Sequence, residues 1–220
     1  MSKLRLLFVK EAQASYISHL DLMRTFQRVF PRAELSLRHS NGFHPHPIIS
    51  IVLPLPVGQS SECELLDFET VEDSTGEGVA EKLNSGMPMG LRVLDCRPPE
   101  KPARELAYLR AQLEMIYDHG VPQDAEEKLT ELFARKELVI EKRTKHKDLA
   151  EIDVIPLLKS ISFRREGESL FADTVVSAQN PGLNPAYLVQ AIGRELPEYA
   201  PDFTRVRRKE LFDAEMKTFR

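Results

Sequence analysis

The sequence has little cysteine and no long hydrophobic run, and each absence excludes a class of protein. Its two cysteines, Cys63 and Cys96, are too few for a disulfide scaffold. They form no C-x-x-C pair of the kind that binds zinc or an iron–sulfur cluster. No apolar run approaches the roughly 20 residues of a membrane-spanning helix, and the first residues lack the long apolar core of a signal peptide. We therefore expect a cytoplasmic protein with no membrane partner.

Common catalytic and nucleotide-binding motifs are missing as well. The chain has no G-x-S-x-G nucleophile elbow, and neither cysteine has a histidine close in sequence. Walker-type and dinucleotide-binding glycine patterns are also missing. The net charge is −4, so any contact with nucleic acid must come from a local basic surface rather than from the overall field. These absences favour a binding protein over an enzyme but leave the question open.

The first half of the chain alternates strand-like and helix-like stretches. Period-two alternation predicts a strand at "KLRLLFV", and "SHLDLMRTFQRVF" predicts a helix that is capped by Ser18 and ended by Pro31. Further strands are expected at "ELSLRHS", "IISIVLPLPVG", "CELLDFETVE" and "LRVLDCRP", and a second helix at "EGVAEKLNSGMP". This is the β-α-β-β-α-β order of the ferredoxin-like split unit, with an elaborated central hairpin.

The second half repeats this order after "RPPEKPAREL", a stretch rich in proline and charge that is the best linker candidate. Strands are expected at "LAYLRAQLEMIY", at "ELVIEKR", in a hairpin that turns at Glu166-Gly167, and at "FTRVRRKELF". Helices are expected at "PQDAEEKLTELFARK" and at "NPAYLVQAIGREL", where Asn184 is the cap and Pro185 the first helical residue.

The fold class predicted from these patterns is α+β, with two tandem ferredoxin-like (βαββαβ) units that have antiparallel sheets. The predicted parts are an N-terminal domain at residues 1–99, a linker at 100–106 and a C-terminal domain at 107–220.

The stretch "RHSNGFHPHPIISIVLPLPVG" combines histidines, a glycine and prolines directly before an apolar run. Pro45 biases His44 toward an extended conformation, which places the imidazoles of His44 and His46 on one face as a workable ligand pair for zinc or iron. The alternative is that Pro45 and Pro47 stiffen the start of a strand and the imidazoles lie on the surface. The H-x-H pattern is a weak signal, so we expect no metal site here. Whether His44 contributes to a facultative metal site stays open.

The same stretch fits an anion or RNA grip. Ser40 and the residues after it are turn-forming, so their backbone N–H groups can face an anion. Gly42 admits close backbone approach, and Phe43 can stack on a base. The side chains expected to contact phosphate are Arg24, Arg28, Arg38 and His46. The alternative is a solvated basic helix face followed by a strand, with Phe43 buried.

Two further basic runs, "FARKELVIEKRTKHK" and "RVRRK", are compatible with a phosphate-backbone track, although such runs are usually just solvated faces. They contribute Lys142, Arg143 and Arg207 as candidate RNA-binding residues, and neither run carries base-reading information. Alternation along a strand would put Glu62 and Glu64 on one face, which an exposed strand face explains equally well.

From Tyr16 to Leu65 the chain resembles the uncharacterised radical-SAM-linked protein family. Its pattern joins an S/R-H-L-D-hydrophobic-x-R helix to S-x-G-F-N-P-H-P and P-L-P-x-G-x-x-S-x-x-E, and "EIDVIPLL" resembles a later element. The matching positions are His19, Leu20, Asp21, Arg24, Arg28, Ser40, Gly42, Phe43, Pro45, His46, Pro47, Pro54, Leu55, Gly58 and either Glu62 or Glu64. His44 replaces the family's asparagine. An obligatory H-x-H metal pair is therefore not expected, since an amide rarely substitutes for imidazole at a transition metal.

The resemblance implies a protein encoded beside, or fused to, a radical SAM protein. This chain lacks the C-x3-C-x2-C arrangement that binds a radical SAM cluster, so it is expected to be the partner of that catalyst. A weaker likeness in element order to CRISPR RNA-processing proteins also suggests RNA, by fold analogy alone. The leading hypothesis is a non-catalytic accessory protein, without a cofactor, that binds tRNA or rRNA for modification.

Two alternatives remain. The first is a metal-independent ribonuclease or RNA-modifying enzyme that uses His19 or His46 as general acid or base, because imidazole titrates near neutral pH. The second is a docking scaffold for the radical SAM protein. Asp21 is expected to orient His19 or Arg24. Structural roles are expected for Pro45, Pro47, Gly58, Glu62 and Glu64.

Overall fold

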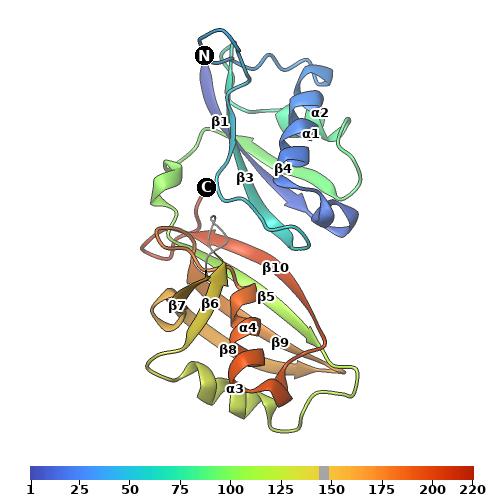
Figure 1. Cartoon of the computed structure of the whole chain (residues 1–220). Coiled ribbons are helices and arrows are strands. Elements are labelled where there is room, and N and C mark those ends of the chain that lie inside the picture. Colours follow the sequence, from blue (N-terminus) through green and yellow to red (C-terminus); the bar gives the residue numbers. More distant parts are fainter. Residues whose placement is uncertain (144–148) are drawn as a thin grey trace. The chain divides into compact units, whose positions relative to one another are not determined.

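The computed structural model describes residues 1–143 and 149–220 and has a mixed α+β fold with antiparallel sheets (Figure 1). The chain divides into two compact units. Unit 1 comprises Met1–Glu105 together with Thr218–Arg220, and unit 2 comprises Leu106–Lys217. Within the described residues, no helix has the length and apolar character needed to cross a membrane.

Unit 1 contains an antiparallel sheet whose strands lie side by side in the order β4-β1-β3-β2. Its strands are β1 (Ser2–Lys10), β2 (Ile49–Ile51), β3 (Ser60–Thr70) and β4 (Leu91–Arg97). Its helices are α1 (His19–Arg32) and α2 (Val79–Asn84), with short 3-10 helices η1 (Ala12–Tyr16) and η2 (Ala103–Glu105). Both α-helices contribute buried side chains to the core of this unit.

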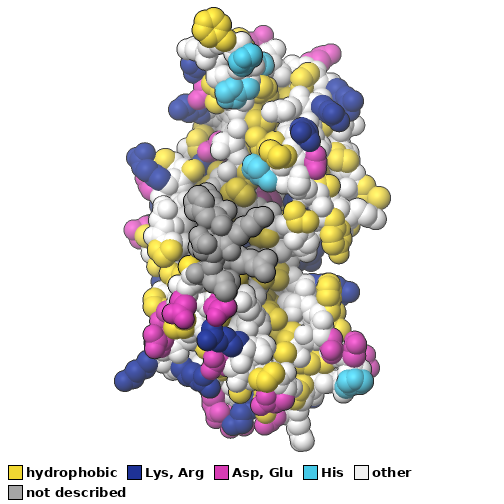
Figure 2. Space-filling view, viewed as in Figure 1, with side chains coloured by type: hydrophobic (Ala, Val, Ile, Leu, Met, Phe, Trp, Pro, Cys, Tyr) yellow, Lys and Arg dark blue, Asp and Glu magenta, His cyan; other side chains and the backbone are white. Residues whose placement is uncertain are grey.

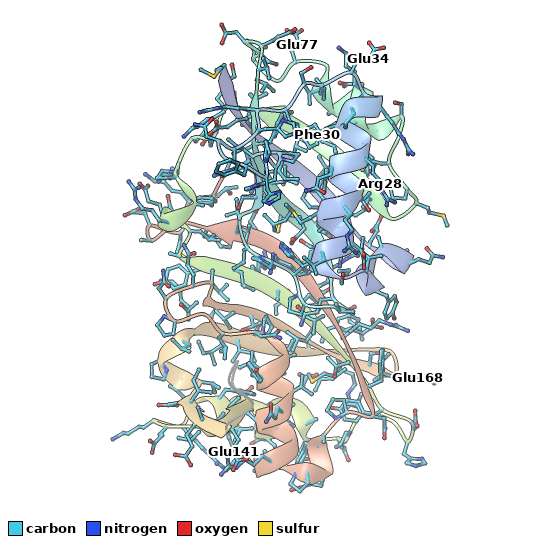
Figure 3. The ribbon with its side chains drawn as sticks, turned by 45° about the horizontal axis from the view of Figure 1, so that its top comes forward. Arg28, Phe30, Glu34, Glu77, Glu141 and Glu168 are labelled. Carbon is cyan, nitrogen blue, oxygen red and sulfur yellow. The ribbon has the colours of Figure 1, made fainter. Side chains whose placement is uncertain are left out.

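The predicted first helix is confirmed as α1, and its apolar side chains pack in the core with those of the sheet. Ser18 caps α1, since its side chain accepts a hydrogen bond from the Asp21 N–H. Phe26 and Phe30 are fully buried, and Figure 3 shows Phe30 beside the strands while Arg28 lies on the exposed side of the helix. Pro31 does not end the helix as predicted. The helix continues to Arg32, because the Ala33 N–H still donates to the Val29 carbonyl at 3.0 Å.

The predicted strands at "ELSLRHS" and "IISIVLPLPVG" are mostly wrong. Only Ile49–Ile51 forms a strand, and the first stretch contributes two isolated bridges, from Leu37 to Thr70 and from His39 to Pro47. Proline has no backbone N–H to donate to a ladder, and four prolines lie in and beside these stretches. The second helix is shorter than the predicted stretch: α2 begins at Val79 and ends at Asn84, and Ser85 is its C-cap.

In unit 2 the main sheet strands are antiparallel and lie in the order β10-β5-β9-β8. Its strands are β5 (Tyr108–Ile116), β8 (Leu158–Glu166), β9 (Ser169–Ser177) and β10 (Phe203–Phe212). The strands β6 (Val139–Arg143) and β7 (Leu149–Asp153) pair with each other in a separate hairpin. Its helices are α3 (Ala125–Phe133), α4 (Ala186–Glu195), η3 (Ile155–Leu157) and η4 (Pro197–Tyr199). The β8–β9 turn is Gly167-Glu168, one residue later than predicted.

The sheet of unit 2 has one covered face and one open face. Along β5, the side chains of Leu109, Ala111, Leu113 and Met115 are buried, and the residues between them are half-buried or exposed. Both α3 and α4 contribute buried apolar side chains, and Phe133 of α3 stacks on Phe163 of β8 at a ring distance of 5.9 Å. The helices therefore cover the apolar face, and the alternate residues of each strand face away from them.

Candidate functional site

The segment from Arg38 to Ile48 folds into a narrow antiparallel ribbon that ends in the "NGFHP" turn. The Ser40 N–H donates to the His46 carbonyl at 2.9 Å, and the Ile48 N–H donates to the Arg38 carbonyl at 2.8 Å. Ser40 Oγ accepts a hydrogen bond from the His46 N–H at 3.2 Å and lies 2.9 Å from His46 Nδ1. Gly42 has φ +124°, a conformation that favours glycine. The ribbon is therefore a braced turn, which we call the histidine turn.

Phe43 lies near the tip of the histidine turn with its side chain fully exposed (102 % of the reference area). The alternative that Phe43 is buried is therefore wrong. His39, His44 and His46 are also exposed, and Figure 2 shows histidine side chains gathered at the top of the view, in unit 1. Among the described residues, no group of three or more His, Cys, Asp or Glu side chains is arranged to hold a metal ion.

The histidine turn borders two hollows. His46 lines a pocket of about 290 Å³, together with Lys3 of β1 and Glu69 of β3. His39 lines a wider groove of about 580 Å³, together with Gln27 near the end of α1. The two imidazoles thus line different hollows.

The His46 pocket has a charged wall in which the carboxylates already have basic partners. Glu69 accepts a hydrogen bond from Arg38 Nη1 at 2.7 Å, and Lys3 Nζ lies 3.7 Å from its other oxygen. Asp67 is held in a two-pronged ion pair by Arg5, at 2.5 and 2.8 Å. Lys3 and Arg38 remain substantially exposed beside the pocket. Their ammonium and guanidinium groups can therefore also meet an anion from solvent.

The basic residues of α1 form a separate group. The Ser18 hydroxyl donates to Asp21 at 2.7 Å, and Arg24 Nη1 donates to the other carboxylate oxygen at 3.1 Å. The hydrogen bond from Ser18, followed by that from Arg24, lowers the pKa of the Asp21 carboxyl. Asp21 therefore holds Arg24. His19 and Arg28 are exposed on the same helix.

The structure does not place His19 beside the histidine turn. The groove beside the turn is lined by Gln27 and Pro31, in the second half of the helix. His19 is the first residue of α1, and 1.5 Å of rise per residue puts it about 18 Å from Pro31 along the helix axis. One positively charged pocket that includes both His19 and His46 is therefore not formed.

The other predicted site residues have varied environments. Gly58 has φ +86°, and its N–H donates to the Ser15 carbonyl at 2.8 Å, which braces the loop before β3. Glu62 is half-buried and Glu64 fully buried in β3, so the expectation of an exposed acidic strand face is wrong for Glu64. Arg207 is half-buried on β10. The side chains of Lys142 and Arg143, and the rest of that basic run at residues 144–148, lie outside the described part of the chain.

Comparison with sequence families gives a match to the family described as "Uncharacterized protein conserved in bacteria (DUF2344)", over residues 3–185. The chain belongs to this family. No curated protein matches it. The match includes α1, the histidine turn and every residue that lines the His46 pocket. The site described above therefore lies inside the family region.

Two solved structures are similar to this DUF2344 chain. One is a chain of a Cbf5-Nop10-Gar1 complex, with a TM-score of 0.53 and 12% identity. That match covers 94% of this chain and 48% of the other, so this chain spans about half its length and the likeness concerns the fold alone. The other is an unknown protein from Galdieria sulphuraria, with a TM-score of 0.29, 11% identity, and coverage of 94% of this chain and 98% of that one.

Sequence reasoning missed the acidic and basic residues that surround the His46 pocket. Lys3 and Arg5 alternate with apolar residues in "KLRLLFV", and Asp67 and Glu69 alternate in "DFET". The register Lys3–Glu69 and Arg5–Asp67 makes these residues direct cross-strand neighbours. Matching opposite charges at period two in two predicted strands is the signal that could have found them.

Proposed function

We propose that this DUF2344 protein is a non-catalytic accessory protein of a radical SAM enzyme and that it binds RNA, tRNA or rRNA, through the histidine turn. The observation that carries the proposal is the fully exposed ring of Phe43 on a turn braced by Ser40 and His46. An apolar ring held in water at a fixed position is suited to stacking on an unpaired base. Arg38 and Lys3 nearby can contact phosphate.

The arrangement of strands and helices in each unit also supports the RNA proposal. We infer that each unit is ferredoxin-like, because each has the order β-α-β-β-α-β, with the β6–β7 hairpin as an insertion in unit 2. Within each unit the sheet strands also follow one order, which is last, first, third, second. A four-stranded sheet of an RRM is a common scaffold for single-stranded RNA, although a fold alone implies no function.

The radical SAM association rests on the sequence resemblance from Tyr16 to Leu65, which lies within the family region. It is tested by purifying the tagged protein from its native cells and identifying both the retained proteins and the retained nucleic acid. A radical SAM protein and a defined tRNA or rRNA are expected together. Retention of neither, under conditions that keep other complexes intact, contradicts the accessory role.

Binding itself is tested with the purified chain, labelled tRNA and rRNA fragments, and a salt series. We expect salt-dependent association, and Phe43→Ala should weaken it by about tenfold, the order expected for loss of one stacked base. Tyr16→Ala is a matched control, because Tyr16 is also an exposed aromatic of unit 1 (70 %) but lies in η1. No salt-dependent association, or equal effects of the two variants, contradicts RNA binding at the histidine turn.

One observation favours a second candidate, a metal-independent ribonuclease. Ser40 Oγ and His46 Nδ1 lie 2.9 Å apart on an exposed turn, within the range for proton transfer between a hydroxyl and a base. The same hydroxyl accepts the His46 N–H, however, which gives the contact a structural role as well. Incubation of labelled RNA with the protein decides between them. Cleavage that is lost in His46→Ala and kept in His44→Ala would establish the enzyme.

A further inference from the structure

The open face of the unit 2 sheet carries aromatic rings with cations beside them. Arg164 Cζ lies 5.2 Å from the centre of the Phe171 ring, and Lys159 Nζ lies 4.5 Å from that of Tyr108. Arg205 lies 5.9 Å from the ring of Phe203, at one end of β10. We call this set the aromatic face. Its members are Tyr108, Lys159, Arg164, Phe171, Phe203 and Arg205.

Strand register places these rings on the side opposite α3 and α4. Phe171 pairs with Glu114, whose neighbours Leu113 and Met115 are the buried ones on the helix-covered side. Phe203 pairs with Ile116, two residues further along β5, so Phe171 and Phe203 flank that strand on its two sides. Tyr108 lies six residues from Glu114, about 20 Å along the strand at 3.4 Å per residue. The rings therefore span the sheet rather than form one cluster.

The cations of this face are held by carboxylates that solvent reaches. Arg164 pairs with Glu166 at 2.6 Å and with Asp173, and Arg205 pairs with Glu114 at 3.1 Å. The two arginine side chains are 44 % and 64 % exposed. Ion pairs of this exposure contribute little net free energy, so a phosphate can replace the carboxylate at small cost. Arg110, also on this face, adds a further exposed guanidinium 3.6 Å from Asp173.

We infer that the aromatic face binds single-stranded RNA, with bases stacked on the rings and phosphates paired with the arginines. The inference rests on the proposed RNA-binding function. It adds a second contact surface and specifies that the bound RNA is single-stranded. Only unpaired bases offer a free face to a ring, since the bases of a duplex are stacked on one another. Stacking of this kind is tolerant of sequence, and its cationic component makes it sensitive to salt.

The test measures fluorescence anisotropy of labelled oligouridine and of a labelled RNA duplex of equal length with the full chain. We expect the single strand to bind more tightly than the duplex. Phe171→Ala should weaken single-strand binding by about tenfold, and Arg164→Ala should lower the slope of log K against log salt by about 0.7, the value for one phosphate contact on a single strand. Arg135→Ala is the matched control. Arg135 is 46 % exposed and paired with Glu195 at 2.7 Å, and it follows α3.

The outcomes separate this inference from the proposed function. If Phe43→Ala weakens binding and both Phe171→Ala and Arg164→Ala bind like the parent protein, the histidine turn is supported and the aromatic face is overturned. If the aromatic-face variants weaken binding and Phe43→Ala does not, the inference holds and the histidine turn is contradicted. Equal affinity for single strand and duplex, or equal losses in Arg164→Ala and Arg135→Ala, overturns the stacking inference. Urea unfolding of each variant shows whether a loss of binding reflects loss of the fold.

Discussion

The two units each pair an arginine of their first sheet strand with an aspartate of their third, in very different surroundings. In unit 1, Arg5 is 2 % exposed, makes two bonds to Asp67 and lies 5.0 Å from the ring centre of Phe219. In unit 2, Arg110 is 53 % exposed and lies 3.6 Å from Asp173. A charged residue at an alternate strand position can therefore be a part of the interior or a part of an open surface. Its identity alone does not tell which.

The largest expected effect comes from breaking the buried pair. Arg5→Ala should lower the free energy of unfolding by about 3 kcal/mol, the low end of the range for a broken buried pair, since Asp67 keeps some contact with water. Arg110→Ala should cost less than about 0.5 kcal/mol, as for an exposed pair. Urea unfolding of both variants measures the difference. Equal costs would show that burial does not separate the two pairs.

Thiol labelling sharpens the comparison, because both cysteines lie in unit 1 and are buried. Burial, and then the nearby Asp95 charge, raises the pKa of the Cys96 thiol to about 12. At pH 8 the native thiol is therefore protonated and unreactive, and labelling requires that unit 1 opens. Labelling by a disulfide reagent should be at least about tenfold faster in Arg5→Ala, in line with the expected loss of stability. It should be unchanged in Arg110→Ala, and rapid labelling of the parent protein would contradict this account.

A smaller effect is expected where the helices begin. Ser18→Ala removes the side-chain cap of α1 and should cost about 1 kcal/mol. Asp124, at the start of α3, makes no capping bond, although it accepts a hydrogen bond from the Tyr199 hydroxyl at 3.0 Å. Asp124→Ala should therefore cost less than Ser18→Ala in thermal or urea unfolding. The reverse order would contradict the assignment of Ser18 as the cap.

The sequence predicted the elements whose side-chain pattern and local chemistry agree. The helix from His19 has a cap, an apolar stripe and a partner sheet, and it forms within two residues of its predicted end. "ELSLRHS" has the alternation of a strand but faces a segment in which Pro45 and Pro47 cannot donate. The alternation predicted a strand, but the stretch forms only two isolated bridges, although Arg38 and His39 still have different surroundings.

The candidate site was predicted in part for a similar reason. The motif in "SNGFHPHP" marks a turn through glycine and proline chemistry, which is local and readable from the sequence. That His19 lies at the end of α1 remote from this turn follows from where α1 packs on the sheet, which is a tertiary property. The charges of β1 and β3 meet only because of the register between those strands. Charge runs in a sequence thus locate cations along the chain, and the sheet decides which of them share a surface.

The smallest predicted effect concerns the Asp21 carboxylate at the start of α1, which accepts hydrogen bonds from Ser18 and Arg24. Its hydrogen bonds to Ser18 and Arg24 hold the pKa below the ordinary value of 3.8, so ionised Asp21 stabilises the folded state. That contribution is present above the unfolded pKa and is lost as the pH falls through the lower, folded pKa. The melting temperature of Asp21→Asn should therefore lie below that of the parent protein at pH 7, and the difference should shrink below about pH 4. In a protein that also carries Ser18→Ala, the effect of Asp21→Asn on the melting temperature should be smaller. The Ser18 hydrogen bond is the larger of the two causes of the lowered pKa, and it is then missing. A difference that persists undiminished in strong acid would mean that the asparagine disturbs α1 sterically rather than through its missing charge.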